Sequence, residues 1–135
     1  MAELPDDVRG LFAGANFAHV ATVAPDGAPH SVPVWVGLEG DLIAFFTQPA
    51  SPKARNLEAD PRVAVSITDH DAPYRMAQVR GRVVERLEGE PALVIADRLA
   101  TRYTGRPFPM RSGVAFLVEP ERVVSMNLPF EHTPA

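Results

Sequence analysis

Short runs of alternating apolar and polar residues make up most of the chain, and turn-forming residues separate them. This alternation has the period of β-strands, in which successive side chains point to opposite faces of a sheet. Asp26-Gly27 and Glu39-Gly40 separate the first three runs and are typical of tight turns, so these runs predict a three-stranded meander. The expected strands are 17–24, 30–38, 42–47, 62–69, 75–87 and a last pair, 114–119 and 122–128.

Three other segments have the spacing or the end signals of short helices. Residues 5–13 repeat apolar side chains at helical spacing, residues 51–59 begin with a favourable N-cap serine and a proline, and residues 91–103 follow a Gly-Glu-Pro start. Pro33 has no amide hydrogen, so its strand is expected at a sheet edge or a bulge. The elements predict a mainly β (α+β) fold: a six- to seven-stranded antiparallel split β-barrel with short flanking helices, in a single domain over residues 1–135.

Composition narrows the classes of function. The formal net charge of −4 and the pI of about 5.5 provide no basic field, so nucleic acid is not an expected partner. The sequence contains no cysteine, which excludes disulfides, thiol catalysis and thiolate metal sites. The acidic start does not resemble a signal peptide, and no stretch approaches the roughly 20 apolar residues of a membrane span. We therefore expect a cytoplasmic protein that makes no membrane contact.

The second expected helix begins with two cations, Lys53 and Arg55, although the N-terminus of a helix already carries a partial positive charge. Each of these cations costs roughly a few tenths of a kcal/mol in the absence of a ligand. A bound phosphate would reverse the sign, because both the free amides of the helix and the cations attract an anion. The alternative interpretation is a solvated helix face, on which Lys53 and Arg55 pair with Glu58 or Asp60.

Two further patterns are compatible with a cofactor site. The segment VPVWV (32–36) offers a flat apolar wall with backbone hydrogen-bonding groups, as a tricyclic redox ring requires, although a core strand has the same pattern. Arg98, Arg102, Arg106 and Arg111 fall within 14 residues that contain no acid, so they predict either a positive patch for an anionic tail or a solvated face. The four histidines show no paired metal-ligand spacing, and we expect no metal site.

The chain contains, in order, HVATVAPDGAPHSVPVWV, LIAFFT, SPKARNLEADPRVAV and a strand that reaches Gly81. This succession resembles the pyridoxamine 5'-phosphate oxidase-like split-barrel superfamily of flavin and deazaflavin proteins, over residues 5–128. KARNL followed by DPR is most similar to the branch that uses the deazaflavin coenzyme F420. The tail RVVSMNLPFEHTP, which includes His132, is also similar to that branch.

The resemblance implies a homodimer that holds its cofactor, F420 or alternatively FMN, in grooves at the subunit interface. Lys53 would contact the cofactor phosphate, residues 32–36 would lie along the ring, and the second chain would contribute the strand that ends at Gly81. The apolar runs LIAFFT and VAFLVE are expected to suit such a subunit interface. The expected cofactor-binding residues are Ser31, Val32, Pro33, Val34, Trp35, Thr47, Gln48, Ser51, Lys53, Arg55, Asn56, Met76, Ala77, Gln78, Arg106 and Arg111.

The sequence also departs from the vitamin B6 oxidases of this superfamily. Met76 stands five residues before Gly81, where those enzymes carry a glutamine, and their substrate-binding C-terminal segment is missing. The resemblance therefore implies an F420-dependent oxidoreductase that transfers a hydride between the reduced deazaflavin and a small planar conjugated substrate. No catalytic residue is identifiable. The alternatives are an FMN-binding oxidoreductase and a non-catalytic flavin or deazaflavin carrier or sensor.

Overall fold

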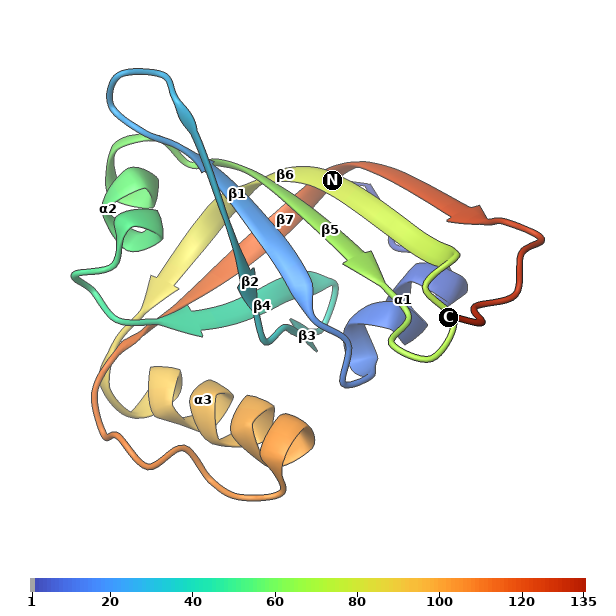
Figure 1. Cartoon of the computed structure of the whole chain (residues 1–135). Helices are drawn as coiled ribbons and strands as arrows, with labels where there is room; N and C mark the ends of the chain where they lie inside the picture. Colours follow the sequence, from blue (N-terminus) through green and yellow to red (C-terminus); the bar gives the residue numbers. More distant parts are fainter. Residues whose placement is uncertain (1) are drawn as a thin grey trace.

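The computed structural model describes residues 2–135, which form one seven-stranded sheet and three helices. Neighbouring strands are antiparallel, in the order β2-β1-β5-β6-β7-β4-β3. Figure 1 shows the sheet curled, with α2 and α3 towards one end and α1 towards the other. The elements are α1 (Asp6–Ala13), β1 (Ala18–Val23), β2 (Pro29–Val34), β3 (Gly37–Glu39), β4 (Leu42–Thr47), α2 (Pro52–Ala59), β5 (Arg62–Thr68), β6 (Arg75–Leu87), α3 (Gly89–Thr104) and β7 (Val114–Asn127).

The expected strand 30–38 is two strands, and the expected meander is wrong. β2 pairs with β1 as far as Val34, whereas β3 begins at Gly37 and pairs with β4. β2 and β3 lie at the two edges of the sheet, and only Trp35 and Val36 connect them. The sheet must therefore curl until its edges approach each other. In the described part of the chain no hydrogen-bonded ladder joins β2 to β3 or β4, so the barrel stays split there.

The expected final strand pair is a single strand. β7 continues through both expected segments and pairs with β6 along its length. The register shifts between Arg80 and Gly81, and Gly81 faces Pro120. A Cβ atom on Gly81 would lie 2.2 Å from the carbonyl oxygen of Glu119, so only glycine fits there. Pro120 thus marks an irregularity within a ladder instead of a turn. Pro33 lies on the edge strand β2, as predicted.

Two hydrophobic layers stabilise this arrangement. One fills the curled sheet and includes Phe45 and Phe116, whose ring centroids are 5.5 Å apart. The other lies between α3 and the outer faces of β4 and β7, where Leu99 packs with Ala44 and Leu117. Both faces of LIAFFT and VAFLVE are therefore covered within one chain. Their apolar character is explained by these contacts and does not point to a subunit interface.

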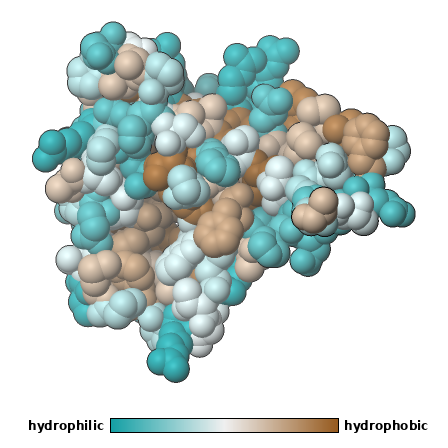
Figure 2. Space-filling model, in the orientation of Figure 1, coloured by the Kyte–Doolittle hydropathy of each residue, from teal (hydrophilic) through white to brown (hydrophobic). Residues whose placement is uncertain are grey.

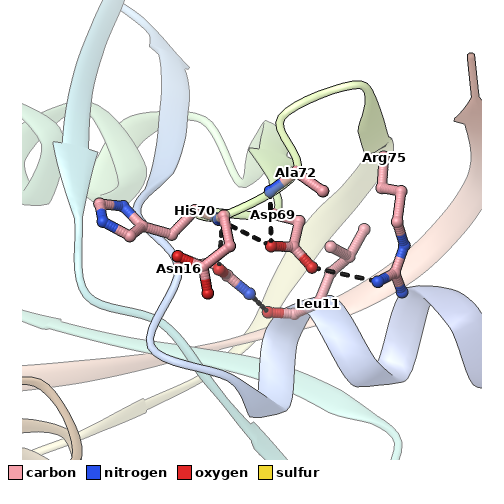
Figure 3. Close-up of polar contacts among 7 residues, drawn as sticks. Leu11, Asn16, Asp69, His70, Ala72 and Arg75 are labelled. Atoms are coloured by element: carbon pink, nitrogen blue, oxygen red, sulfur yellow. Dashed lines mark hydrogen bonds and ion pairs between the residues drawn. The ribbon is translucent and has the colours of Figure 1, made fainter. Parts of the chain in front are cut away.

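A structured loop between β5 and β6 is fastened to the segment that follows α1 (Figure 3). A carboxylate oxygen of Asp69 accepts a hydrogen bond from the amide of Ala72 at 3.1 Å, and the other lies 3.2 Å from Nη1 of Arg75. The amide of His70 donates to Oδ1 of Asn16 at 2.8 Å. Figure 3 shows the imidazole of His70 pointing away from these contacts. The loop is thus a hydrogen-bonded polar turn in which His70 and Asp71 are exposed.

Candidate functional site

A cavity of about 400 Å³ lies where β2 and β4 separate, between α2 and α3. This volume is within the range of small-molecule sites, about 300–1,000 Å³. Figure 2 shows hydrophobic surface gathered in a hollow between the positions that α2 and α3 occupy in Figure 1. The lining residues are Phe17, Pro33, Val34, Trp35, Phe46, Thr47, Gln48, Lys53, Ala96, Leu99, Phe108 and Met110.

Aromatic side chains give this cavity flat walls. Trp35 stacks on Tyr103, with ring centroids 5.5 Å apart and an angle of 12° between the rings, and Phe17 also packs against Tyr103 at 5.5 Å. Phe46 and Phe108 form a second pair, edge to face, at 5.1 Å. Burial raises the pKa of Tyr103, so its hydroxyl stays protonated and hydrogen-bonded to the backbone. The cavity therefore suits a planar, mainly apolar ring system.

Lys53 is the only lysine of the sequence, and it lies half-buried at this cavity, in the first turn of α2. Desolvation lowers the pKa of Lys53 below its ordinary value of 10.5. Within residues 2–135, neither Lys53 nor Arg55 forms an ion pair with a carboxylate. Asp60 pairs instead with Arg62 at 2.6 Å, which lowers the pKa of Asp60 to about 2. The expected alternative pairing of these cations with Glu58 or Asp60 is therefore not seen among residues 2–135, although Arg55 does lie on an exposed face of the helix.

The start of α2 is fixed by hydrogen bonds to the end of β4. Ser51 is the N-cap residue, as expected, and its Oγ accepts a hydrogen bond from the amide of Ala54 at 3.3 Å. The hydroxyl of Thr47 donates to the same oxygen at 3.0 Å. Thr47 is buried, so its contact with Ser51 fixes the start of α2. The same contact therefore positions Lys53 relative to the cavity.

Several expected site residues lie outside the cavity. Asn56 is 6% exposed and its Nδ2 donates to Oγ1 of Thr22 at 3.0 Å, which fastens α2 to β1. Val32 is partly buried, packs against the core of the curled sheet and is not among the lining residues. Ser31 and Arg55 are exposed and do not line the cavity. Their expected cofactor contacts stay predictions.

Met76, Ala77 and Gln78 line a different hollow, of about 250 Å³, on the face of the sheet formed by β1, β5, β6 and β7. Val124 and Met126 also line it and remain 44% and 43% exposed. One chain alone does not bring this strand to the cavity that Lys53 occupies. The arrangement agrees with the expectation that the strand serves the site of a second chain, which stays a prediction.

The expected arginine patch is largely neutralised by contacts within the chain. Arg98 pairs with Glu39, and Arg111 forms a two-pronged pair with Asp97, with N···O distances of 2.9 and 3.2 Å. Arg102 donates to backbone carbonyls. Among these four arginines, only Arg106 makes neither kind of side-chain contact with the described residues. The patch is thus reduced to one available cation, and the commitment of Arg111 to Asp97 leaves its expected cofactor contact a prediction.

Sequence reasoning missed half of the cavity lining. Phe17, Phe46, Ala96, Leu99, Phe108 and Met110 come from four separate segments that meet only in the fold. One signal was available for the last two, because Phe108 and Met110 are large apolar residues within a polar, proline-containing loop. Within residues 2–135, no group of three or more His, Asp or Glu side chains could hold a metal ion. No helix of that part is long and apolar enough to span a membrane.

The sequence matches the family model described as pyridoxamine 5'-phosphate oxidase over residues 4–127. The chain belongs to this family, and its seven-stranded antiparallel sheet with three helices is the split-barrel fold of the superfamily. The predicted family and fold class are confirmed. None of the curated protein sequences matches the chain.

Solved structures agree with this assignment. An F420 reductase is 31% identical, with a TM-score of 0.79 over 90% of this chain and 98% of that chain. A conserved hypothetical protein, Rv2991 from Mycobacterium tuberculosis, is 24% identical, with a TM-score of 0.80 over 100% of this chain and 94% of that chain. The General Stress Protein 26 from Bacillus anthracis is 18% identical, with a TM-score of 0.66 over 90% of this chain and 92% of that chain. The last two similarities concern the fold alone.

Proposed function

We propose that this protein is an F420-dependent oxidoreductase that transfers a hydride between the reduced deazaflavin and a small planar conjugated substrate. One observation carries the proposal: the only lysine of the sequence lies half-buried at the edge of a cavity with aromatic walls, without an acidic partner among residues 2–135. A desolvated cation that the described chain does not neutralise is suited to an anionic ligand. The similarity to an F420 reductase supports the choice of cofactor.

The residues present fit such a cofactor. Lys53 and the N-terminus of α2 would hold the phosphate. Pro33, Val34 and Trp35 would support the flat ring, and Arg106 is the cation available to an anionic tail. This division places charge near the helix end and apolar surface along the strand, as a phosphorylated ring compound requires.

The residues of the cavity mainly position the cofactor and exclude water from it. When bound, the reduced cofactor supplies a hydride, which is two electrons and one proton, to the oxidised substrate. Lys53 is the only titratable side chain of the lining, and it is assigned to the phosphate. Solvent therefore supplies the second proton that completes the reduction of the substrate. The aromatic walls exclude water from the reacting atoms, which strengthens the electrostatic interactions around them.

Two observations favour the alternatives. F420 carries an anionic tail that distinguishes it from FMN, and a positive patch would favour that tail. The pairing of Arg98 and Arg111 with acids removes much of this positive charge, so FMN is the second candidate cofactor. The lining contains no acid that could donate a proton, which would equally suit a carrier or sensor. Turnover distinguishes an enzyme from a carrier, because only an enzyme oxidises its bound reduced cofactor faster when an acceptor is added.

We also propose that two copies of the chain pair through the sheet face that Met76, Gln78, Val124 and Met126 occupy. This face carries exposed apolar side chains, and the family resemblance implies that it approaches the cofactor of the other copy. Sedimentation should give twice the chain mass, and Met126→Arg should shift the protein towards monomer. A monomer at micromolar concentration with its cofactor bound would contradict this arrangement.

The test of the proposed function is a parallel titration of the purified protein with F420 and FMN. Trp35 is the only tryptophan and lines the cavity, so quenching of its fluorescence reports binding directly. The mass and absorption spectrum of any small molecule that co-purifies would identify the cofactor independently. Binding of F420 supports the proposal, tighter binding of FMN supports the second candidate, and binding of neither overturns both.

A further inference from the structure

The loop 105–113 forms a wall of the cavity, and the proposed function assigns no ligand contact to its Phe108 or Met110. It follows α3 and brings Phe108 and Met110 into the lining. Met110 is 53% exposed although its side chain is large and apolar. Large apolar side chains at the rim of a concave site commonly contact a ligand, and methionine adapts its shape to different partners.

Asp97, which belongs to α3, fixes the middle of this loop. Its Oδ1 accepts a hydrogen bond from the amide of Phe108 at 3.1 Å, and its two oxygens face Arg111 at 2.9 and 3.2 Å. Arg111 donates in turn to the carbonyl oxygen of Phe108 at 3.0 Å. Both polar groups of the Phe108 backbone are therefore engaged by one ion pair. Two-pronged carboxylate–guanidinium pairs restrict geometry, so this contact sets the direction in which Phe108 points.

The end of the loop is fixed by a second set of contacts. Nε2 of Gln48 donates to the carbonyl oxygen of Ser112 at 3.0 Å. Gly113 lies so close to Phe46 that a Cβ atom would be 2.2 Å from the ring, and its φ of 149° also favours glycine. The ring of Phe46 packs in turn against Phe108. The loop is thus held against the cavity at two points, by Asp97 in its middle and by Gln48 at its end. These contacts keep its apolar side chains at the cavity.

The positions of the walls assign this loop a role. α2, which carries Lys53, and α3, which is followed by the loop, lie on different sides of the end of β4 (Figure 1). A phosphate at Lys53 and a ring along Pro33, Val34 and Trp35 would leave the other face of the ring towards the loop. Hydride transfer requires the acceptor to lie against an open face of the ring.

We propose that Phe108 and Met110 form the acceptor-binding wall, which favours planar apolar acceptors, and that Asp97 is a positioning residue that acts through the backbone of Phe108. This inference rests on the proposed function. The proposed function concerns the phosphate and ring contacts of Lys53, Pro33, Val34 and Trp35, whereas this inference concerns Phe108 and Met110 in the loop that follows α3.

The experiment titrates menadione, a planar apolar quinone, into protein saturated with oxidised F420, and measures heat. Oxidised F420 has no hydride to donate, so binding is observed without turnover. Phe108→Ala is expected to weaken menadione binding about tenfold, because an aromatic contact and its buried area are lost. Met110→Ala is expected to weaken it about threefold. The affinity for F420 should change by less than about twofold in both variants. Val94→Ala is the control, since Val94 is a 54% exposed apolar residue of α3 outside the lining.

A second series tests the positioning role. Asp97→Ala removes the acceptor for the Phe108 amide and the partner of Arg111, and is expected to raise the KM for menadione about fivefold with kcat within about twofold. Asp97→Asn keeps an acceptor oxygen and should have a smaller effect, and Asp97→Glu should restore part of the loss. Glu39→Gln is the matched control, because it breaks the pair between α3 and β3 through Arg98 without touching the loop.

The outcomes separate the two proposals. Failure to bind either F420 or FMN would overturn the proposed function and this inference together. Two results would overturn the inference alone. One is binding of F420 without binding of menadione, and the other is a menadione affinity in the Phe108, Met110 and Asp97 variants that equals the wild-type affinity. A loss of F420 affinity in Phe108→Ala with unchanged menadione affinity would also overturn it, since the loop would then serve the cofactor.

Discussion

Two regions of the molecule are rich in cations, and they differ in whether these cations are paired within the chain. The start of α2 carries Lys53 and Arg55, neither of which pairs with a carboxylate of the described chain. The second half of α3 and its loop carry four arginines, of which Arg98 and Arg111 are paired with acids and Arg102 is bonded to backbone. The smaller cluster therefore has no carboxylate partner among the described residues, whereas most arginines of the larger cluster make contacts that stabilise the fold.

The difference shows that the charged residues within a short stretch of sequence do not reveal which cations are left unpaired in the fold. The partner of Arg98 is Glu39, which lies 59 positions away in the sequence. Asp97 directly precedes the acid-free stretch, and its carboxylate reaches Arg111 only because the loop turns back along α3. Of the acids nearest to Lys53 in sequence, Asp60 is held by Arg62. Burial then raises the cost of the lone charge and makes a bound anion more favourable.

The largest effect is expected from removing the charge of Lys53. A charge-assisted hydrogen bond to a partly buried anion is worth about 1.5–3 kcal/mol, so Lys53→Ala should weaken cofactor binding about tenfold to hundredfold. The melting temperature without cofactor should stay the same or rise, because a desolvated cation at a helix N-terminus is lost. Lys53→Arg should retain much of the affinity. An unchanged dissociation constant in Lys53→Ala, measured by Trp35 fluorescence, would mean that the phosphate site lies elsewhere.

The next effect concerns the choice of cofactor. We expect F420 to bind about threefold to tenfold more tightly than FMN, and the difference to shrink with salt, because exposed charges are screened. Arg106→Ala should remove most of this difference, since Arg106 is the available cation of the α3 region. Arg98→Ala is the matched variant and should leave the difference intact, because Arg98 is already paired with Glu39. Equal or tighter binding of FMN would favour the flavin alternative.

A third expectation concerns the protonation of Lys53. Its pKa is lowered in the folded protein, so the charged form weakens the fold at neutral pH. This penalty begins to fall as the pH rises through the lowered pKa and is gone above the unfolded value of 10.5. A bound phosphate should raise the pKa again. Because Lys53 is the only lysine, reductive methylation with ¹³C labels this residue and the N-terminal amine alone, and NMR can follow its titration. If the cofactor left the titration of Lys53 unchanged, its ammonium group and the cofactor phosphate would not be in contact.

The smallest effect is expected at low pH in the α3 region. Arg111 lowers the pKa of Asp97, so the contribution of this pair is present above the unfolded value of 3.8 and is lost as the pH falls through the lowered pKa. As the pH falls through this lowered pKa the loop should loosen, and acrylamide should quench Trp35 slightly more. Asp97→Asn should show the higher quenching at neutral pH and little further change on acidification. A wild-type protein whose quenching is independent of pH would contradict this role of the ion pair.

Local patterns determined much of the fold. The alternation over 62–69 and 75–87 predicts β5 and β6 almost to the residue, and Ser51-Pro52 predicts the start of α2. These features depend on side-chain period and on capping chemistry, which neighbouring residues supply. The break between β2 and β3 could not be predicted in this way. It occurs because one half of an apolar run pairs with β1 and the other half with β4.

The sequence by itself determined the family, the two cations Lys53 and Arg55 at the start of a helix and the apolar segment 32–36, since each depends on residues that are close together in the chain. Only the tertiary structure decided which cations stay free, and which side chains complete the cavity. Phe17, Phe46, Leu99 and Phe108 come from four segments, and no local period links them. Their meeting depends on the curl of the sheet and on the packing of α3 against β4 and β7, which are long-range contacts.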